Sequence, residues 1–288
     1  MRTRLLVGSL VLLLCWCDVA LAQRSGGVLR IFHRDNPSSA SILEETNAST
    51  VVAFMPIFNN LVIFDPAAAQ NTDESIVPDL AESWSWNDDR TELSFKLRRG
   101  VTWHDGMPFT SSDVECTFNL LTNRARNRLR ANPRGAWFGN INFVQAPSDY
   151  EVTIHLNRPQ PSLLPMLASG FTPIYPCHVP PSQMRVKPVG TGPFKLESYW
   201  PPARRCRGAV EFSVVASRST ALLSFVAGRY DMTFPGDVSM TQLRDVRRQS
   251  PRVTCEEAAM NNNTNLMMNR DAPPFNDPDI RRVVMLAL

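Results

Sequence analysis

The stretch FKLRRGVTWHDGMPFTSSDV, from Phe95 to Val114, decides the local fold more clearly than any other part of the chain. It places His104 beside Asp105 in a protein with only 4 histidines, so the pair could be a chemical site or a turn. Asp105-Gly106 directly after a strand-like run is a strong turn signal. We therefore predict that the pair bends the backbone and holds a joint of the fold.

A helix is predicted directly after this turn. Thr110 and Asp113, three residues apart, match a capping box, and an acidic residue in the first turn suits the helix dipole. Val114, Phe118 and Leu121 then recur at helical spacing and predict one buried face. The whole stretch is thus typical of a strand, a tight turn and a capped helix.

The competing interpretation is an exported metal-dependent hydrolase that uses His104 and Asp105. That chemistry needs further histidines and carboxylates that converge on one point. His33, His155 and His178 lie in predicted strands or in a proline-rich loop, without a ligand spacing such as H-E-x-x-H. No Ser-His-Asp or Cys-His pattern is recognisable either, so we predict no catalytic residue, no metal site and no cofactor.

Alternating apolar residues and turn signals predict several further elements along the chain. The expected strands and hairpins are a strand over 26–34, a strand over 61–64, a hairpin over 83–98, a hairpin over 141–156 with its turn at 147–149, and a strand over 230–234. The expected helices are a short one ending near 59–60, one over 220–227 closed by Gly228, and one that starts at Asp277 with Pro278 in the first turn.

The glycines of VGTGPFKL, residues 189–196, do not form a phosphate cradle. A P-loop needs four residues between its glycines, a Ser or Thr after the lysine, and a helix that follows. Here Gly190 and Gly192 are separated by one residue, and Pro193 with the alternating FKLESY predicts a strand instead. Nucleotide binding is not expected.

The N-terminus reads as a secretory signal peptide over residues 1–22. Arg2 and Arg4 precede the apolar run Leu5–Leu14, and Ala20-Leu21-Ala22 offers a small-x-small cleavage pattern. Lipid modification at Cys15 or Cys17 is disfavoured because a large residue precedes each. The apolar run is too short for the roughly 20 residues that span a bilayer. The formal net charge of +3 gives no footprint for nucleic acid or an anionic membrane.

Four cysteines follow the predicted cleavage site: Cys116, Cys177, Cys206 and Cys255. In an oxidising compartment they could pair in three ways or stay as free thiols. Their wide spacing fits no zinc pattern. The sequence leaves free thiols and one bridge as equal alternatives.

Five segments, taken in order, carry a resemblance to a known family. They are PDLAESWSW, FKLRRGVTWHDGMPFTSSDV, PVGTGPFKLESY, LLSFVAGRYDM and APPFNDPDIRRVVMLAL. From about Gly27 onward the chain resembles the family 5 extracellular solute-binding proteins, the peptide/nickel-type receptors of ATP-binding-cassette importers. Between Tyr199 and Val210 it departs from them, because this segment is shorter and more basic than the family pattern.

The resemblance implies an α/β fold of the periplasmic binding protein type II kind, with two lobes joined by a hinge. Residues 27–64 and 188–269 would form a mixed-sheet first lobe, and 65–187 an additional β-rich α+β subdomain. Residues 270–288 would begin the second lobe. Because the sequence stops inside an amphipathic pattern, we expect most of that lobe to be missing and one wall of the cleft with it.

The resemblance also implies a function without catalysis. The protein would capture a small peptide or another small solute in the periplasm and deliver it, as a monomer, to a membrane permease. A peptide, nickel complex, opine, sugar or haem all remain open as cargo. Asn262, Asn263 and Asn265 could offer amide groups to a peptide backbone, and Arg34 with Asp35 could hold its charges. A non-catalytic scaffold protein is a third alternative.

Overall fold

The computed structural model describes residues 27–197, 209–255 and 273–286. The predicted signal peptide, residues 1–22, lies outside this range. The chain divides into two units, Met1–Thr254 and Cys255–Leu288. Within the second unit the described element is helix α8, Pro278–Leu286, which begins at the predicted proline. All other elements below belong to the first unit.

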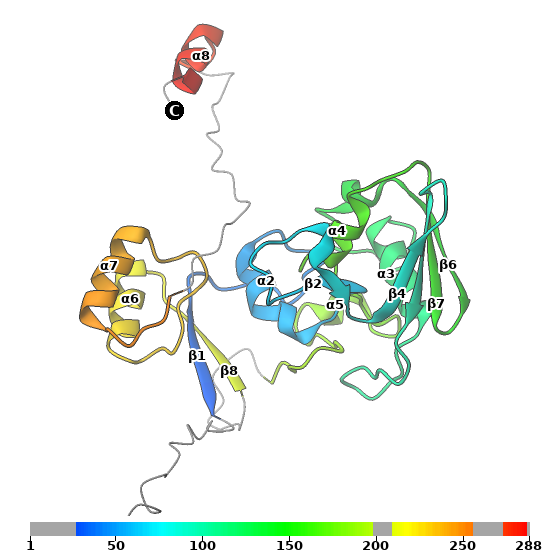
Figure 1. Ribbon diagram of the computed structural model, residues 1–288, viewed down its shortest axis with the longest axis horizontal. Coiled ribbons are helices and arrows are strands. Elements are labelled where there is room, and N and C mark those ends of the chain that lie inside the picture. The colour runs from blue at the N-terminus through cyan, green and yellow to red at the C-terminus, as the bar shows by residue number, and fades with distance from the viewer. Residues whose placement is uncertain (1–26, 198–208, 256–272, 287–288) are drawn as a thin grey trace, which may run out of the picture. The chain divides into compact units, whose positions relative to one another are not determined.

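A parallel pair of strands joins the beginning of the first unit to its later part. β1, Val28–His33, pairs with β8, Ala209–Val214, in a register that runs from Val28↔Ala209 to His33↔Val214 (Figure 1). The two strands are far apart in sequence, as the resemblance implied for a discontinuous lobe. The exact lobe boundaries stay a prediction.

Two helices follow β8. α6, Arg218–Val226, has Ser217 as its N-cap, and the side chain of Ser217 accepts a hydrogen bond from the Thr220 N–H. α7, Met240–Gln249, was not predicted from the sequence. A small core joins β1 to this region through Phe32, Ala221 and Phe234.

The strand predicted over 230–234 is wrong except for one bridge, between Ile31 and Met232. Asp231 turns its carboxylate onto β1, where Oδ2 accepts the Arg30 backbone N–H at 2.8 Å. The side chain therefore takes a ladder position that a backbone carbonyl would occupy in a continuous strand.

A four-stranded antiparallel sheet is the largest sheet among the described residues of the first unit. Its strands lie in the order β4, β5, β7, β6, with bounds Ala81–Trp86, Glu92–Leu97, Glu151–Leu156 and Ile141–Ser148. Both predicted hairpins are confirmed, although the second turn lies at Asp149-Tyr150. Helix α3, Ser111–Leu121, covers one face and buries Val114, Phe118 and Leu121 as predicted.

Short elements join this sheet to the segment after β1. α2, Ala48–Phe54, leads into the 3-10 helix η1, Met55–Ile57, and β2, Val62–Phe64, pairs with β3, Ile76–Pro78. The remaining bounds are η2, Asp73–Ser75; η3, Gly135–Phe138; α4, Leu163–Ala168; and α5, Pro181–Met184. One large core, with members from Ala40 to Val189, includes residues of all these elements except η2.

The second wrong expectation is a strand beginning at Phe194, because residues 194–197 are not in a strand. The backbone here follows η1 instead. The Gly192 N–H donates to Ile57 O at 2.9 Å and the Phe194 N–H to Pro56 O at 3.2 Å. Residues 198–208, which include most of the shortened segment and Cys206, lie outside the described residues.

A disulfide and the character of the helices complete the description of the fold. Cys116 in α3 and Cys177 form a disulfide across 61 residues of chain, with Cα atoms 5.5 Å apart, while Cys255 is a free thiol. Of the two alternatives left by the sequence, free thiols or one bridge, the structure thus shows one bridge. Across the described ranges, no helix combines the length and apolar character needed to cross a membrane.

Candidate functional site

The carboxyl ends of the parallel strands β1 and β8 are the natural place to look for a ligand site. Open α/β sheets bind ligands outside the carboxyl ends of their strands. His33 and Val214 are paired as the last residues of the two strands. The segment 34–39 that leaves β1 here, called the rim below, carries the candidate residues Arg34 and Asp35.

His33 itself holds this end of the strand together. Its ring is buried, with Nδ1 2.6 Å from Asp35 O and Nε2 3.0 Å from Ser49 O. Phe212 and Phe234 approach the ring edge-to-face, with centroids 5.7 and 4.7 Å away. Because both ring nitrogens face backbone carbonyls, His33 fixes the turn and is not free to bind a metal.

Arg34 and Asp35, which the sequence suggested as partners for the charges of a peptide, lie at this edge, and their contact with a solute stays a prediction. The Asp35 carboxylate accepts the Ser49 hydroxyl at 3.1 Å and lies 3.9 Å from Arg34 Nε. The Arg34 guanidinium stacks over the Phe234 ring at 4.8 Å from its centroid and is one-third exposed. Each side chain is thus held in place by a neighbouring residue, while its charged group stays accessible.

Two further residues at this edge were missed by sequence reasoning. The side chain of Asp237 is only 2% exposed, and its Oδ1 lies 3.8 Å from Arg34 Nε and 3.8 Å from Arg218 Nη2. The only signal in the sequence was the turn Pro235-Gly236 before Asp237, and it does not reveal the two arginines. The structure therefore brings Arg34, Asp35, Arg218 and Asp237 together.

The other predicted contacts, Asn262, Asn263 and Asn265, lie outside the described residues, so their role stays a prediction.

His104 and Asp105 form the predicted turn. The His104 N–H donates to Gly190 O at 2.9 Å, and its Nε2–H donates to Gly192 O at 2.8 Å. Asp105 accepts the Met107 N–H at 3.2 Å and pairs with His178 at 2.7 Å. The polar groups of His104 and Asp105 thus bond to the backbone of Gly190, Gly192 and Met107 or to the His178 side chain.

A metal centre at this couplet lacks ligands. In the described part of the chain, no three His, Cys, Asp or Glu side chains are grouped so that they could hold a metal ion. Hydrogen bonds from His178 and the Met107 N–H outweigh the effect of burial and lower the pKa of Asp105. The couplet is therefore a hydrogen-bonded turn.

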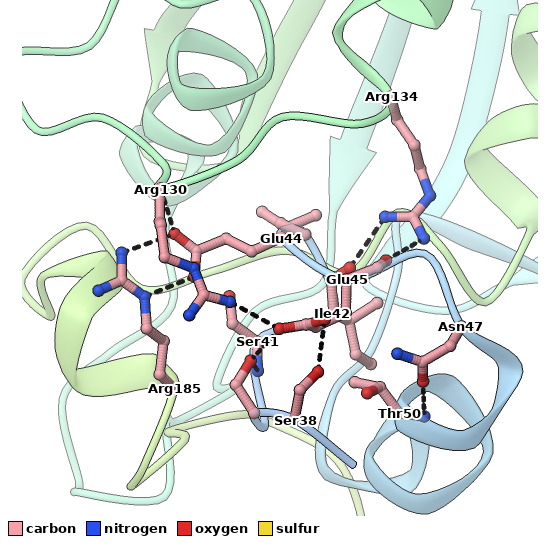
Figure 2. Close-up of polar contacts among 12 residues, drawn as sticks. Ser38, Ser41, Ile42, Glu44, Glu45, Asn47, Thr50, Arg130, Arg134 and Arg185 are labelled. Carbon is pink, nitrogen blue, oxygen red and sulfur yellow. Dashed lines mark hydrogen bonds and ion pairs between the residues drawn. The ribbon is translucent and has the colours of Figure 1, made fainter.

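A cluster of acidic and basic side chains anchors the chain just after the rim, and sequence reasoning did not predict it (Figure 2). Glu44 is fully buried and accepts two hydrogen bonds from Arg185, at 2.6 and 2.8 Å, and one from the Arg130 N–H. The Glu45 carboxylate accepts hydrogen bonds from the side chains of Ser38, Ser39 and Arg130 at 2.7–2.8 Å. These contacts fix residues 38–45 on segments that lie about ninety to one hundred and forty positions later in the sequence.

Arg134 and Tyr175 complete this anchor. Arg134 is buried, donates to the carbonyls of Ile42 and Glu45, and stacks over Phe171 at 4.4 Å. Burial raises the pKa of Tyr175 to about 12, and its hydroxyl accepts the Leu43 N–H at 3.3 Å. All carbonyl and carboxylate groups named here have donors, so the anchor is a structural support of the rim.

Comparisons with known proteins agree with this architecture. A putative ABC transporter peptide-binding protein of Brucella ovis is 37% identical over 152 residues, which are 49% of this chain and 27% of the relative. A probable di/tripeptide-binding protein of Pseudomonas aeruginosa is 26% identical over 284 residues, 85% of this chain and 51% of the relative. The chain thus spans about half or less of the length of these relatives.

The same fold occurs in a solved structure of a binding protein from Agrobacterium tumefaciens R10 in complex with mannopinic acid. The TM-score is 0.71 at 24% sequence identity, over 89% of this chain and 54% of that one. Residues 75–288 match the family described as bacterial extracellular solute-binding proteins, family 5 Middle. That match covers well over half of the sequence, so this chain belongs to the family 5 bacterial extracellular solute-binding proteins.

Proposed function

We propose that the protein is the substrate-binding component of an ATP-binding-cassette importer. It captures peptides or similar small solutes in the periplasm and delivers them, as a monomer, to a membrane permease. The observation that carries this proposal is the family match over residues 75–288, together with relatives named as peptide-binding and di/tripeptide-binding proteins. The signal peptide predicted over residues 1–22 provides the export that this role requires.

In this proposal the protein makes and breaks no covalent bond in the solute. Its candidate catalytic pair, His104 and Asp105, is engaged in the turn that meets Gly190 and Gly192. General acid–base or metal chemistry needs groups that reach a substrate, and these groups are directed at backbone. The hydrolase alternative has no support among the described residues.

Ligand contact is proposed at the carboxyl edge of β1 and in the asparagine-rich segment. Arg34 and Asp35 supply opposite charges, which suit the two termini of a short peptide. Asn262, Asn263 and Asn265 supply amide donors and acceptors for a peptide backbone, as in strand addition. The solute stabilises a closed form because it contacts both walls of the cleft only in that form.

Calorimetry on the protein as expressed from its gene tests this function. Mixed dipeptides and tripeptides are expected to bind with release of heat and to change the tryptophan fluorescence. His104→Ala should bind the same pool with wild-type affinity, although its stability falls. A wild-type protein that binds no peptide, or that hydrolyses peptides in a His104-dependent way, contradicts the proposal.

A further inference from the structure

The carboxylate of Asp237 stands out among the buried charges of the described chain. Its side chain is 2% exposed, and neither oxygen accepts a hydrogen bond there. A buried carboxylate without donors is costly, and proteins normally pair such groups closely. Glu44, equally buried, shows the usual solution with its bonds to Arg185 and Arg130. Asp237 therefore needs another explanation.

Two guanidinium groups form long ion pairs with one oxygen of this carboxylate, and neither donates a hydrogen bond to it. Arg34 Nε and Arg218 Nη2 both lie 3.8 Å from Asp237 Oδ1. The two nitrogens are hence separated by at most twice this distance. Two charge-assisted hydrogen bonds of about 2.7–2.9 Å, with the width of a carboxylate between them, reach across such a span. One external carboxylate could therefore bridge both arginines.

The two arginines are accessible, whereas the aspartate behind them is not. The Arg34 and Arg218 side chains are 34% and 62% exposed. A solute can contact their donors, but an ammonium group could not reach Asp237 without displacing them. The exposed chemistry of this pair is therefore that of an anion site.

The sign of the charge at the start of α6 supports this assignment. Arg218 is the first residue of the helix, and no acidic residue lies in its first turn. A helix N-terminus favours anions and disfavours cations, so an arginine here is an unfavourable choice for the helix alone. With an anion between the arginines, the helix dipole and both side chains act in the same direction.

We propose that Arg34 and Arg218 together bind a carboxylate of the captured solute, and that Asp237 is the buried residue that positions them. This inference rests on the proposed function and adds a substrate class to it: solutes with a free carboxylate, such as peptides with an unmodified C-terminus. Asp35, 3.9 Å from Arg34 Nε, and Asp237, 3.8 Å from both arginines, balance the two positive charges, so the selectivity is for a carboxylate that bridges the two guanidinium groups and not for anions in general.

Matched peptide pools test the proposal. Calorimetry on the protein as expressed from its gene compares a dipeptide pool with free C-terminal carboxylates and the same pool with C-terminal amides. We expect amidation to weaken binding by about 10- to 100-fold, which is the range for charge-assisted hydrogen bonds. Arg34→Gln and Arg218→Gln should weaken binding of the free acids similarly and leave binding of the amides unchanged.

The controls separate this inference from its premise. Arg229→Gln changes an exposed arginine just after α6 and should preserve the preference for free acids. Arg218→Lys keeps the charge without the planar fork and should restore part of the preference. Thermal melts identify any variant that is unfolded. Equal binding of both pools by the wild type, or equal weakening of both pools in the variants, overturns the inference alone. Binding of neither pool overturns the proposed function as well.

Discussion

Replacing Gly190 with alanine tests how the family signature PVGTGPFKL holds the fold. A Cβ at this position would lie 1.9 Å from Ile57 O and 2.7 Å from Ile57 C. Both are backbone atoms of η1, so no side chain can rotate away. The strand-like loop must therefore move off η1 by more than an ångström.

That movement breaks identifiable hydrogen bonds. Those at risk are Gly192 N–H to Ile57 O at 2.9 Å, Phe194 N–H to Pro56 O at 3.2 Å, and both bonds from His104 to this loop. Each bond contributes a net of about 0.5–1.5 kcal/mol, so four of them amount to roughly 2–6 kcal/mol. We expect a loss of about 3 kcal/mol in the free energy of unfolding, because part of the loop can relax.

Urea denaturation followed by tryptophan fluorescence measures this loss. Gly139→Ala is the matched control, because its Cβ would meet only Ala136 O at 3.5 Å and its φ of −63° suits alanine. That change should be neutral or stabilising by about 0.4–1 kcal/mol. A Gly190→Ala protein within about 0.5 kcal/mol of the wild type would refute the packing argument.

Three other predictions concern charges and the disulfide. Glu44→Gln should lower the free energy of unfolding by about 3 kcal/mol at pH 7, as for other broken buried pairs. Burial opposes ionisation of Glu44, but hydrogen bonds from Arg185 and Arg130 lower its pKa below 4.5. The resulting stabilisation is present above pH 4.5 and is lost as the pH falls through the lowered pKa. Thermal melts should therefore show a smaller difference in stability between the wild type and Glu44→Gln at pH 3 than at pH 7. Asp237→Asn should melt at or above the wild-type temperature, since its carboxylate accepts no hydrogen bond among the described residues; a large fall would show that the two arginines stabilise it fully. Replacing Cys116 and Cys177 by serine should cost up to about 4 kcal/mol for a loop of this length, and a thiol assay under denaturing conditions that finds both cysteines free in the exported wild type would contradict the bridge.

Sequence signals within short windows predicted those elements that nearby residues determine. The hairpin over β4 and β5, the capped helix α3 and the turn at His104-Asp105 all follow from alternation, capping and turn residues within short windows. Their apolar faces are then buried as the pattern requires. These elements need no distant partner to be recognisable.

Errors occurred where a distant contact overrides the local pattern. Phe194–Glu197 alternates like a strand, but η1 captures its backbone. Tyr230–Phe234 meets β1 through a single bridge and the Asp231 carboxylate instead of a continuous ladder. α7 escaped notice because only Leu243 and Val246 of its residues are buried, so its apolar stripe is narrow.

The candidate site was predictable only in part. Arg34 and Asp35 follow a predicted strand, and position alone indicated them. Asp237 and Arg218 join them from segments about two hundred residues away, and nothing in their own neighbourhoods signals that meeting. The Glu44–Arg185 pair spans 141 positions and was hidden for the same reason.

The central claim is that this family 5 protein captures a solute and leaves it unchanged. Native mass spectrometry of the protein purified from its host, followed by chromatography of the released ligand, tests this most directly. We predict one small solute per protein chain, recovered intact after prolonged incubation with the protein. Cleaved products of the solute, or a metal ion bound at His104 and Asp105, would contradict the account.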